Sequence, residues 1–115
     1  MALVAGTGFV AFGTLHWPLA RPRLGKDGVQ EVEIVIQGGY SPDRVQVRRG
    51  APVRIIFNRR EGGECTQWVI FPGLDIVCWL PAFRKTTVEV EPPAPGEFEF
   101  RCKFGVCRGR LIVMA

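Results

Sequence analysis

The chain alternates hydrophobic and polar residues over most of its length, a pattern that predicts β-strands. Successive side chains of a strand point to opposite faces, so each alternating segment predicts a strand with one face in a core. Residues 68–71 are almost entirely apolar and predict a strand buried on both faces. The segments with strand character are 32–36, 45–47, 53–57, 68–71, 88–90, 98–102 and 111–113. Gly and Pro punctuate them, and there is no helical period or internal repeat. We therefore predict an all-β fold, a Greek-key β-sandwich of seven to eight strands.

Residues 1–26 differ from the rest. Ala2 to Ala20 contains no Asp, Glu, Lys or Arg, and Arg21, Arg23 and Lys26 follow it. As a helix, this stretch would be about 28 Å long, close to the thickness of a bilayer core. Its glycines and Pro18 weaken the helix, and its start lacks the basic residues of a secretory signal. A single membrane anchor, a packed arm of the domain and a poor signal peptide remain as alternatives. We divide the chain into an N-terminal apolar segment with a basic linker, 1–26, and a domain, 27–115.

The anchor hypothesis predicts a membrane-associated protein, with residues 2–20 in the bilayer. The basic residues after them favour the cytoplasmic side for the domain, because positive flanking residues tend to stay inside.

Charge and motifs exclude several classes of function. The net charge is +4, and six arginines fall between residues 44 and 60. We expect a solvated basic face there, since no nucleic-acid motif accompanies it. The chain has no phosphate-binding loop and no Ser-His or Cys-His pair. We therefore expect no nucleic-acid partner, no small-molecule substrate and no enzymatic activity.

The four cysteines carry the main chemical signal. One predicted strand ends at Cys102, a short loop then carries Cys107, and a second strand follows. Two rigid strands would fix both ends of this loop. The only histidine is His16, so a His₂Cys copper site cannot be built from this chain alone. Any metal would be held mainly by sulfur. We expect the flanking Arg101, Lys103 and Arg108 to favour the thiolates.

Five segments together resemble the cupredoxin-like domains associated with bacterial copper handling, some of which stand near copper-transporting ATPases or follow a membrane anchor. They are 38–50, 65–72, 80–81, 95–102 and 108–109. The resemblance implies a cupredoxin sandwich and metal residues at Cys65 and Cys102. Phe104 and Val106 occupy the places where the family commonly has loop methionines, and they would shield the site from water. Cys107 lies where blue-copper proteins often carry an axial methionine.

We therefore predict that Cys65, Cys102 and Cys107 bind copper as Cu(I), for sequestration or for transfer to a copper transporter or a membrane complex. Zn²⁺ is an alternative metal, with Cys78 as a weaker, fourth ligand. A disulfide between Cys65 and Cys102, or inert buried thiols, are the structural alternatives. A metal-free docking subunit of a membrane complex is the alternative function, and an electron-transfer cupredoxin ranks below it.

Overall fold

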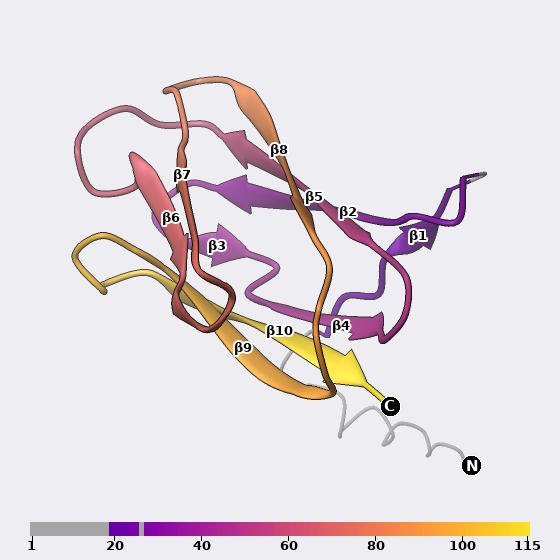
Figure 1. The fold of residues 1–115 in the computed structure, drawn as a ribbon. Helices are drawn as coiled ribbons and strands as arrows, with labels where there is room; N and C mark the ends of the chain where they lie inside the picture. Colours follow the sequence, from indigo (N-terminus) through magenta and orange to yellow (C-terminus); the bar gives the residue numbers. More distant parts are fainter. Residues whose placement is uncertain (1–18, 26) are drawn as a thin grey trace, which may run out of the picture.

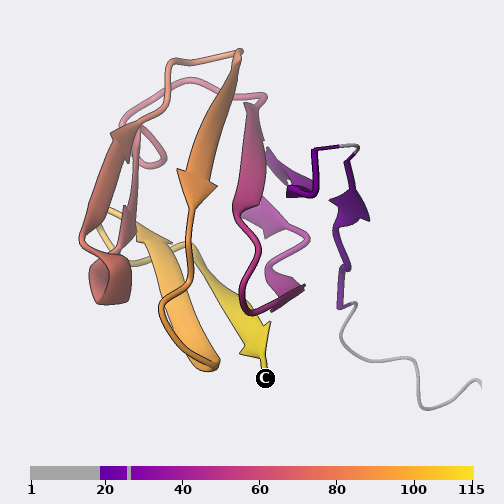
Figure 2. The ribbon, with the colours of Figure 1, turned by 45° about the vertical axis from the view of Figure 1, so that its right-hand side comes forward.

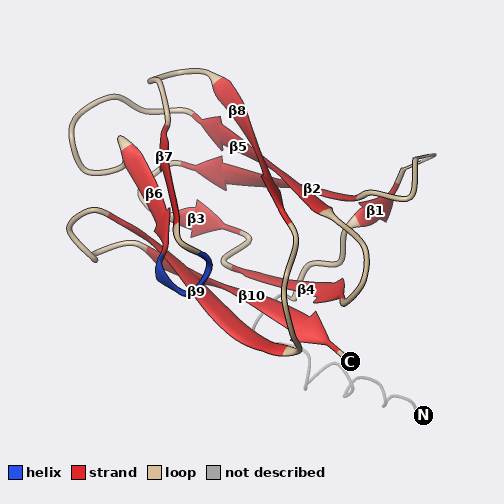
Figure 3. Cartoon of the chain, viewed as in Figure 1, coloured by secondary structure: helices blue, strands red, loops and turns tan. Residues whose placement is uncertain are grey.

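A computed structural model describes residues 19–25 and 27–115 as two β-sheets packed face to face (Figures 1 and 2). The predicted all-β sandwich is confirmed. The described residues form ten strands, two more than the upper prediction, because β1 and β3 are two-residue strands that leave little trace in the sequence. Among the described residues, a single short helical turn, Pro72–Leu74, interrupts the β structure (Figure 3).

The first sheet has the order β1-β2-β5-β8, with β3 paired to β2. Its strands are β1 (Arg23–Leu24), β2 (Gln30–Ile36), β3 (Tyr40–Ser41), β5 (Val53–Arg59) and β8 (Lys85–Val90). Strands β2 and β5 run parallel, while the other pairs are antiparallel.

The second sheet has the order β4-β10-β9-β6-β7. Its strands are β4 (Arg44–Arg48), β10 (Arg108–Met114), β9 (Gly96–Cys102), β6 (Trp68–Phe71) and β7 (Ile76–Trp79). Strands β4 and β10 are parallel, and β9 pairs antiparallel with both β10 and β6. The β9–β10 hairpin therefore lies at the centre of this sheet.

Aromatic rings fill the core between the sheets. The centroid of the Phe100 ring lies 5.1 Å from that of Tyr40, 5.3 Å from that of Phe71 and 6.0 Å from that of Phe57. Gly109 pairs with Phe100 across the β9–β10 hairpin. A side chain at Gly109 would overlap the Phe100 ring, so glycine lets this ring lie flat against β10.

Strand β6 differs from its prediction as a strand buried on both faces. Val69 and Phe71 are fully buried, whereas Trp68 and Ile70 are only partly buried. The sandwich has two layers, so β6 has the core on one side and its sheet's outer surface on the other.

Residues just after the apolar segment pack on the sandwich. The Ala20 N–H donates to the carbonyl of Arg44 at 3.0 Å, and the Gln46 N–H donates to the carbonyl of Ala20 at 2.9 Å. Strand β1 then pairs with β2. The described sandwich thus includes residues that the sequence analysis placed in a linker before residue 27.

The predicted anchor at residues 2–20 lies almost entirely outside the described residues. Within residues 19–25 and 27–115, no helix is long and apolar enough to cross a bilayer.

Candidate metal centre

A tight turn between β9 and β10 brings two of the predicted cysteines together. Cys102 ends β9 and is fully buried, and Cys107 immediately precedes β10. The Cys102 N–H donates to the carbonyl of Cys107 at 3.0 Å, and the Gly105 N–H donates to the carbonyl of Cys102 at 3.0 Å. Gly105 has a φ of 73°, a conformation that glycine adopts without strain. The turn is therefore closed by its own backbone.

The backbone of this turn also surrounds the Cys102 sulfur. The Cys107 N–H donates to Cys102 Sγ at 3.3 Å. Burial raises the pKa of the Cys102 thiol, but the N–H groups of Cys107, Phe104, Val106 and Gly105 together lower this pKa below its ordinary value. The turn is thus preorganised for a thiolate at Cys102.

The groups that lower the pKa of Cys102 are backbone N–H groups of the turn, rather than the flanking cations that the sequence predicted. The side chain of Arg108 is engaged elsewhere: its Nε donates to the carbonyl of Gly105 at 2.9 Å, and its Nη1 donates to Glu99 Oε2 at 2.8 Å.

The pKa of the Cys107 thiol is raised rather than lowered. Burial raises its pKa, and the charge and hydrogen bonding of Cys102 raise it further. The charges of Cys65 and Glu61 also raise the pKa of Cys107. A metal cation would reverse these effects, because it favours the deprotonated form of every ligand around it.

Cys65 lies exposed in the loop between β5 and β6, and a buried arginine fixes this loop. Arg59 is 2% exposed. Its Nε donates to Thr66 Oγ1 at 3.1 Å, its Nη1 to the Leu80 carbonyl at 3.0 Å and its Nη2 to the Gly63 carbonyl at 2.7 Å. The guanidinium therefore holds the loop on both sides of Cys65, at Gly63 and at Thr66.

Glu61 completes this network. The Thr66 hydroxyl donates to Glu61 Oε2 at 2.6 Å, and the Gly38 N–H donates to Glu61 Oε1 at 2.7 Å. Both bonds lower the pKa of Glu61, with the bond from Thr66 contributing most.

The expectation that the arginines between residues 44 and 60 form a solvated face is wrong for Arg59, which is buried. Its position in the alternation of Val53, Ile55 and Phe57 is the sequence signal that could have found it.

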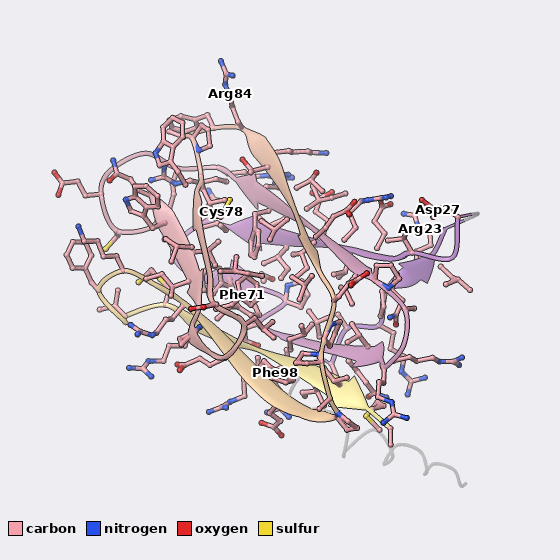
Figure 4. The ribbon with its side chains drawn as sticks, in the orientation of Figure 1. Arg23, Asp27, Phe71, Cys78, Arg84 and Phe98 are labelled. Carbon is pink, nitrogen blue, oxygen red and sulfur yellow. The ribbon has the colours of Figure 1, made fainter. Side chains whose placement is uncertain are left out.

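The fourth cysteine lies apart from the turn. Cys78 pairs with Val69, and Val69 pairs with Cys102, so one strand separates the two cysteines. Strands lie about 4.8 Å apart, which puts the Cys78 and Cys102 backbones roughly 10 Å from each other. Cys78 lies on β7 (Figure 4) and packs against the core, and burial raises its pKa. The structure does not bring it to Cys102 as a fourth ligand.

The hydrophobic residues of the turn do not shield it as predicted. Phe104 is 56% exposed and Val106 is 69% exposed, because the short turn projects both side chains into solvent. Tyr40 is buried in the core, with its ring centroid 5.1 Å from that of Phe100. Its hydroxyl is buried without a hydrogen-bond partner, and burial together with the charges of Cys102 and Cys107 raises its pKa.

The residues present fit a soft metal ion held by sulfur. All four cysteines are free, so the disulfide alternative is not formed. Residues 19–25 and 27–115 contain no histidine and no group of three His, Cys, Asp or Glu side chains arranged to hold a metal ion. The donor set that the fold assembles is the pair Cys102 and Cys107, and the three-cysteine site stays a prediction. Two thiolates suffice for Cu(I), whereas structural Zn²⁺ takes four ligands.

Comparison with known proteins identifies the family. The sequence profile of the cupredoxin-like domain matches residues 7–113. The chain belongs to the cupredoxin-like domain family. No curated protein matches it.

Solved structures share the fold of this cupredoxin-like domain. The metal-binding domain of the Cu(I)-exporting P-type ATPase CopA of Streptococcus pneumoniae, solved with Cu(I), superposes with a TM-score of 0.82 at 23% identity, over 87% of this chain and 99% of that one. A copper-binding protein solved in the apo form superposes with a TM-score of 0.80 at 29% identity, over 86% of this chain and 100% of that one. A multicopper oxidase gives a TM-score of 0.58 at 17% identity, over 82% of this chain and 46% of that one.

We predict that Arg59→Met destabilises the domain and loosens the Cys65 loop. The substitution leaves the carbonyls of Gly63 and Leu80 without their donor, which costs about 3 kcal/mol of unfolding free energy. Urea denaturation measures the loss, and alkylation of Cys65 measures the loosening. Arg60→Met at the exposed neighbouring position is the control and should stay within about 0.5 kcal/mol of the parent. Equal stability of the two variants would contradict the role of Arg59.

We also predict the order in which the two thiols of the turn ionise. In the reduced, metal-free protein, Cys102 forms a thiolate at lower pH than Cys107, because backbone N–H groups lower the pKa of Cys102 while burial and the neighbouring sulfur raise that of Cys107. Thiolate absorbance followed against pH should therefore begin to rise at higher pH in Cys102→Ser than in Cys107→Ser. The reverse order would show that the backbone does not stabilise the Cys102 thiolate.

Proposed function

We propose that this cupredoxin-like domain binds Cu(I) through the thiolates of Cys102 and Cys107 and serves in copper sequestration or transfer. One observation carries the proposal: the turn holds a buried sulfur that accepts a backbone hydrogen bond, with a second thiol beside it. The ligands come from the ends of two paired strands, so little ordering is needed when the metal binds.

The chemistry of these donors favours Cu(I) over the alternatives. Thiolates are soft ligands that select Cu(I), and no imidazole is available among the described residues to support Cu(II). This argues against electron transfer, which needs both oxidation states to be accessible. The copper-binding proteins with the same fold support copper as the metal.

Cys65 supports transfer rather than storage alone. It is exposed, and its charge raises the pKa of Cys107. We infer that Cys65 is the ligand that exchanges, joining the copper ion as a partner thiolate approaches or leaves. The loop held by Arg59 presents this thiol without burying it.

The surroundings of the turn support a protein partner. Phe104 and Val106 are exposed on the turn, and Trp79 and Phe83 are 55% and 71% exposed on the nearby β7 and the loop after it. Exposed apolar groups around a polar centre are typical of interaction sites. Because the similar CopA domain belongs to a copper-exporting ATPase, we propose a copper transporter as the partner.

We further propose that residues 2–20 tether the domain to a membrane, with the domain on the cytoplasmic side. The uncharged stretch and the basic residues after it support this location. The domain has no catalytic role in this proposal.

A metal-free docking subunit is the second candidate function. The exposure of Phe104 and Val106, where the family commonly has methionines, favours it, because such residues serve a protein contact better than a metal site.

An anaerobic Cu(I) titration of the reduced full-length chain, in competition with a chromophoric chelator, separates the two candidates. We expect one Cu(I) per chain, with competition abolished in Cys102→Ser and weakened in Cys107→Ser. Cys78→Ser is the matched control, since its sulfur lies across a strand from the site, and it should bind like the parent. Unchanged binding in Cys102→Ser would refute the site. No competition by the parent chain, together with co-purification in a stoichiometric complex, would leave the docking subunit.

A further inference from the structure

A basic groove lies at the end of the sandwich away from the Cys102–Cys107 turn. It has a volume of about 720 Å³ and opens between β1, β4 and β10. Three arginines line it, Arg21, Arg48 and Arg49, together with apolar residues that include Leu24 and Met114. Residues far apart in sequence therefore meet at this groove.

The groove and the sulfur site occupy opposite ends of β10. This strand begins at Arg108, directly after Cys107, and Met114 at its other end pairs with Arg48 of β4. Six residue steps along a strand span roughly 20 Å. Figure 1 shows the β9–β10 turn at one side of the molecule and the end of β10, beside β4, at the other.

The arginines of the groove form no ion pair with the described residues. The ion pairs of the described residues use Arg54, Lys85, Arg108 and Arg110. Arg21, Arg48 and Arg49 take part in none of them and are exposed. The Arg49 N–H donates to the Met114 carbonyl at 3.1 Å, which joins the end of β10 to the turn that carries the arginines.

Apolar side chains stand exposed among these charges. Leu24 is 69% exposed and Met114 is 43% exposed, although both line the groove. Leu19, where the uncharged stretch joins the described structure, is 40% exposed on the edge of β4. Arginines mixed with exposed aliphatic side chains are typical of surfaces that lie on a bilayer, with cations at the phosphates and apolar groups below them.

We propose that this end of the domain docks on an anionic phospholipid surface. Arg21, Arg48 and Arg49 contact lipid phosphates, and Leu24 and Met114 enter the headgroup region. Charge complementarity supports this occupant, as does the uncharged stretch that ends only one residue before Arg21. A nucleic acid fits less well, because no aromatic side chain lines the groove for base stacking.

Docking in this way goes beyond copper binding and does not require it. It orients the sandwich on the membrane, with the Cys102–Cys107 turn about one strand length above the lipid. The sulfur site then faces soluble partners or the cytoplasmic domains of a transporter, rather than the bilayer.

Vesicle flotation of the full-length chain tests the proposal. The probes are vesicles of phosphatidylcholine alone and vesicles that also contain phosphatidylglycerol. Insertion of the apolar segment would be the same in both, so the measured quantity is the excess affinity for the anionic vesicles. We expect this excess to fall roughly fivefold for each arginine replaced in Arg21→Gln, Arg48→Gln and Arg49→Gln, and to fall with salt.

A charge-matched variant at the other end is the control. Arg60→Gln, Arg84→Gln and Lys103→Gln remove three exposed cations, and Figure 4 shows Arg84 far from β1. This variant should keep the excess affinity. Both triple variants change exposed residues, and thermal unfolding should confirm that they fold like the parent.

Three outcomes would overturn the proposal. They are equal binding to the two kinds of vesicle, an equal loss in the control variant, and release by sodium phosphate when sodium chloride of the same ionic strength has no effect. Binding to a short DNA duplex that exceeds binding to anionic vesicles, and that is lost with the groove arginines, would assign the groove to nucleic acid instead.

Discussion

The hydrogen bond from the Cys107 N–H to Cys102 Sγ is the interaction on which this account of the protein depends. It turns a buried cysteine, which would otherwise be a small hydrophobic side chain, into a site prepared for negative charge. The same turn places the Cys107 thiol beside that charge, where it is costly to ionise without a cation. A metal ion relieves both constraints at once. The turn thus combines one favoured thiolate with one thiol that needs a metal.

The rest of the sandwich keeps this turn in place. Phe100 of β9 lies flat on Gly109 of β10 and contacts Tyr40 and Phe71. Both strands of the hairpin that carries the turn are therefore packed into the core. On the other side of the site, Arg59 holds the loop that presents Cys65. The core thus fixes the hairpin, while Cys65, Phe104 and Val106 stay exposed on the surface.

Local patterns in the sequence were enough to predict the sandwich, and the spacing of Cys102 and Cys107 was enough to predict that one turn joins them. Properties that depend on register were not predictable. Cys78 was a plausible ligand until pairing placed Val69 between it and Cys102. We expected Arg59 to be one more surface arginine, although its place in the alternation of β5 indicates a side chain that points inward. The source of the low pKa at Cys102 was also hidden, because backbone N–H groups leave no signal in the side-chain sequence.

X-ray absorption at the copper edge of the anaerobic, Cu(I)-loaded chain counts the atoms bound to copper. We expect sulfur neighbours only: two in Cys65→Ser, supplied by Cys102 and Cys107, and at most one more in the parent. Nitrogen or oxygen neighbours, or a sulfur count that is unchanged in Cys107→Ser relative to the parent, would contradict the claim that the turn between β9 and β10 is the copper site.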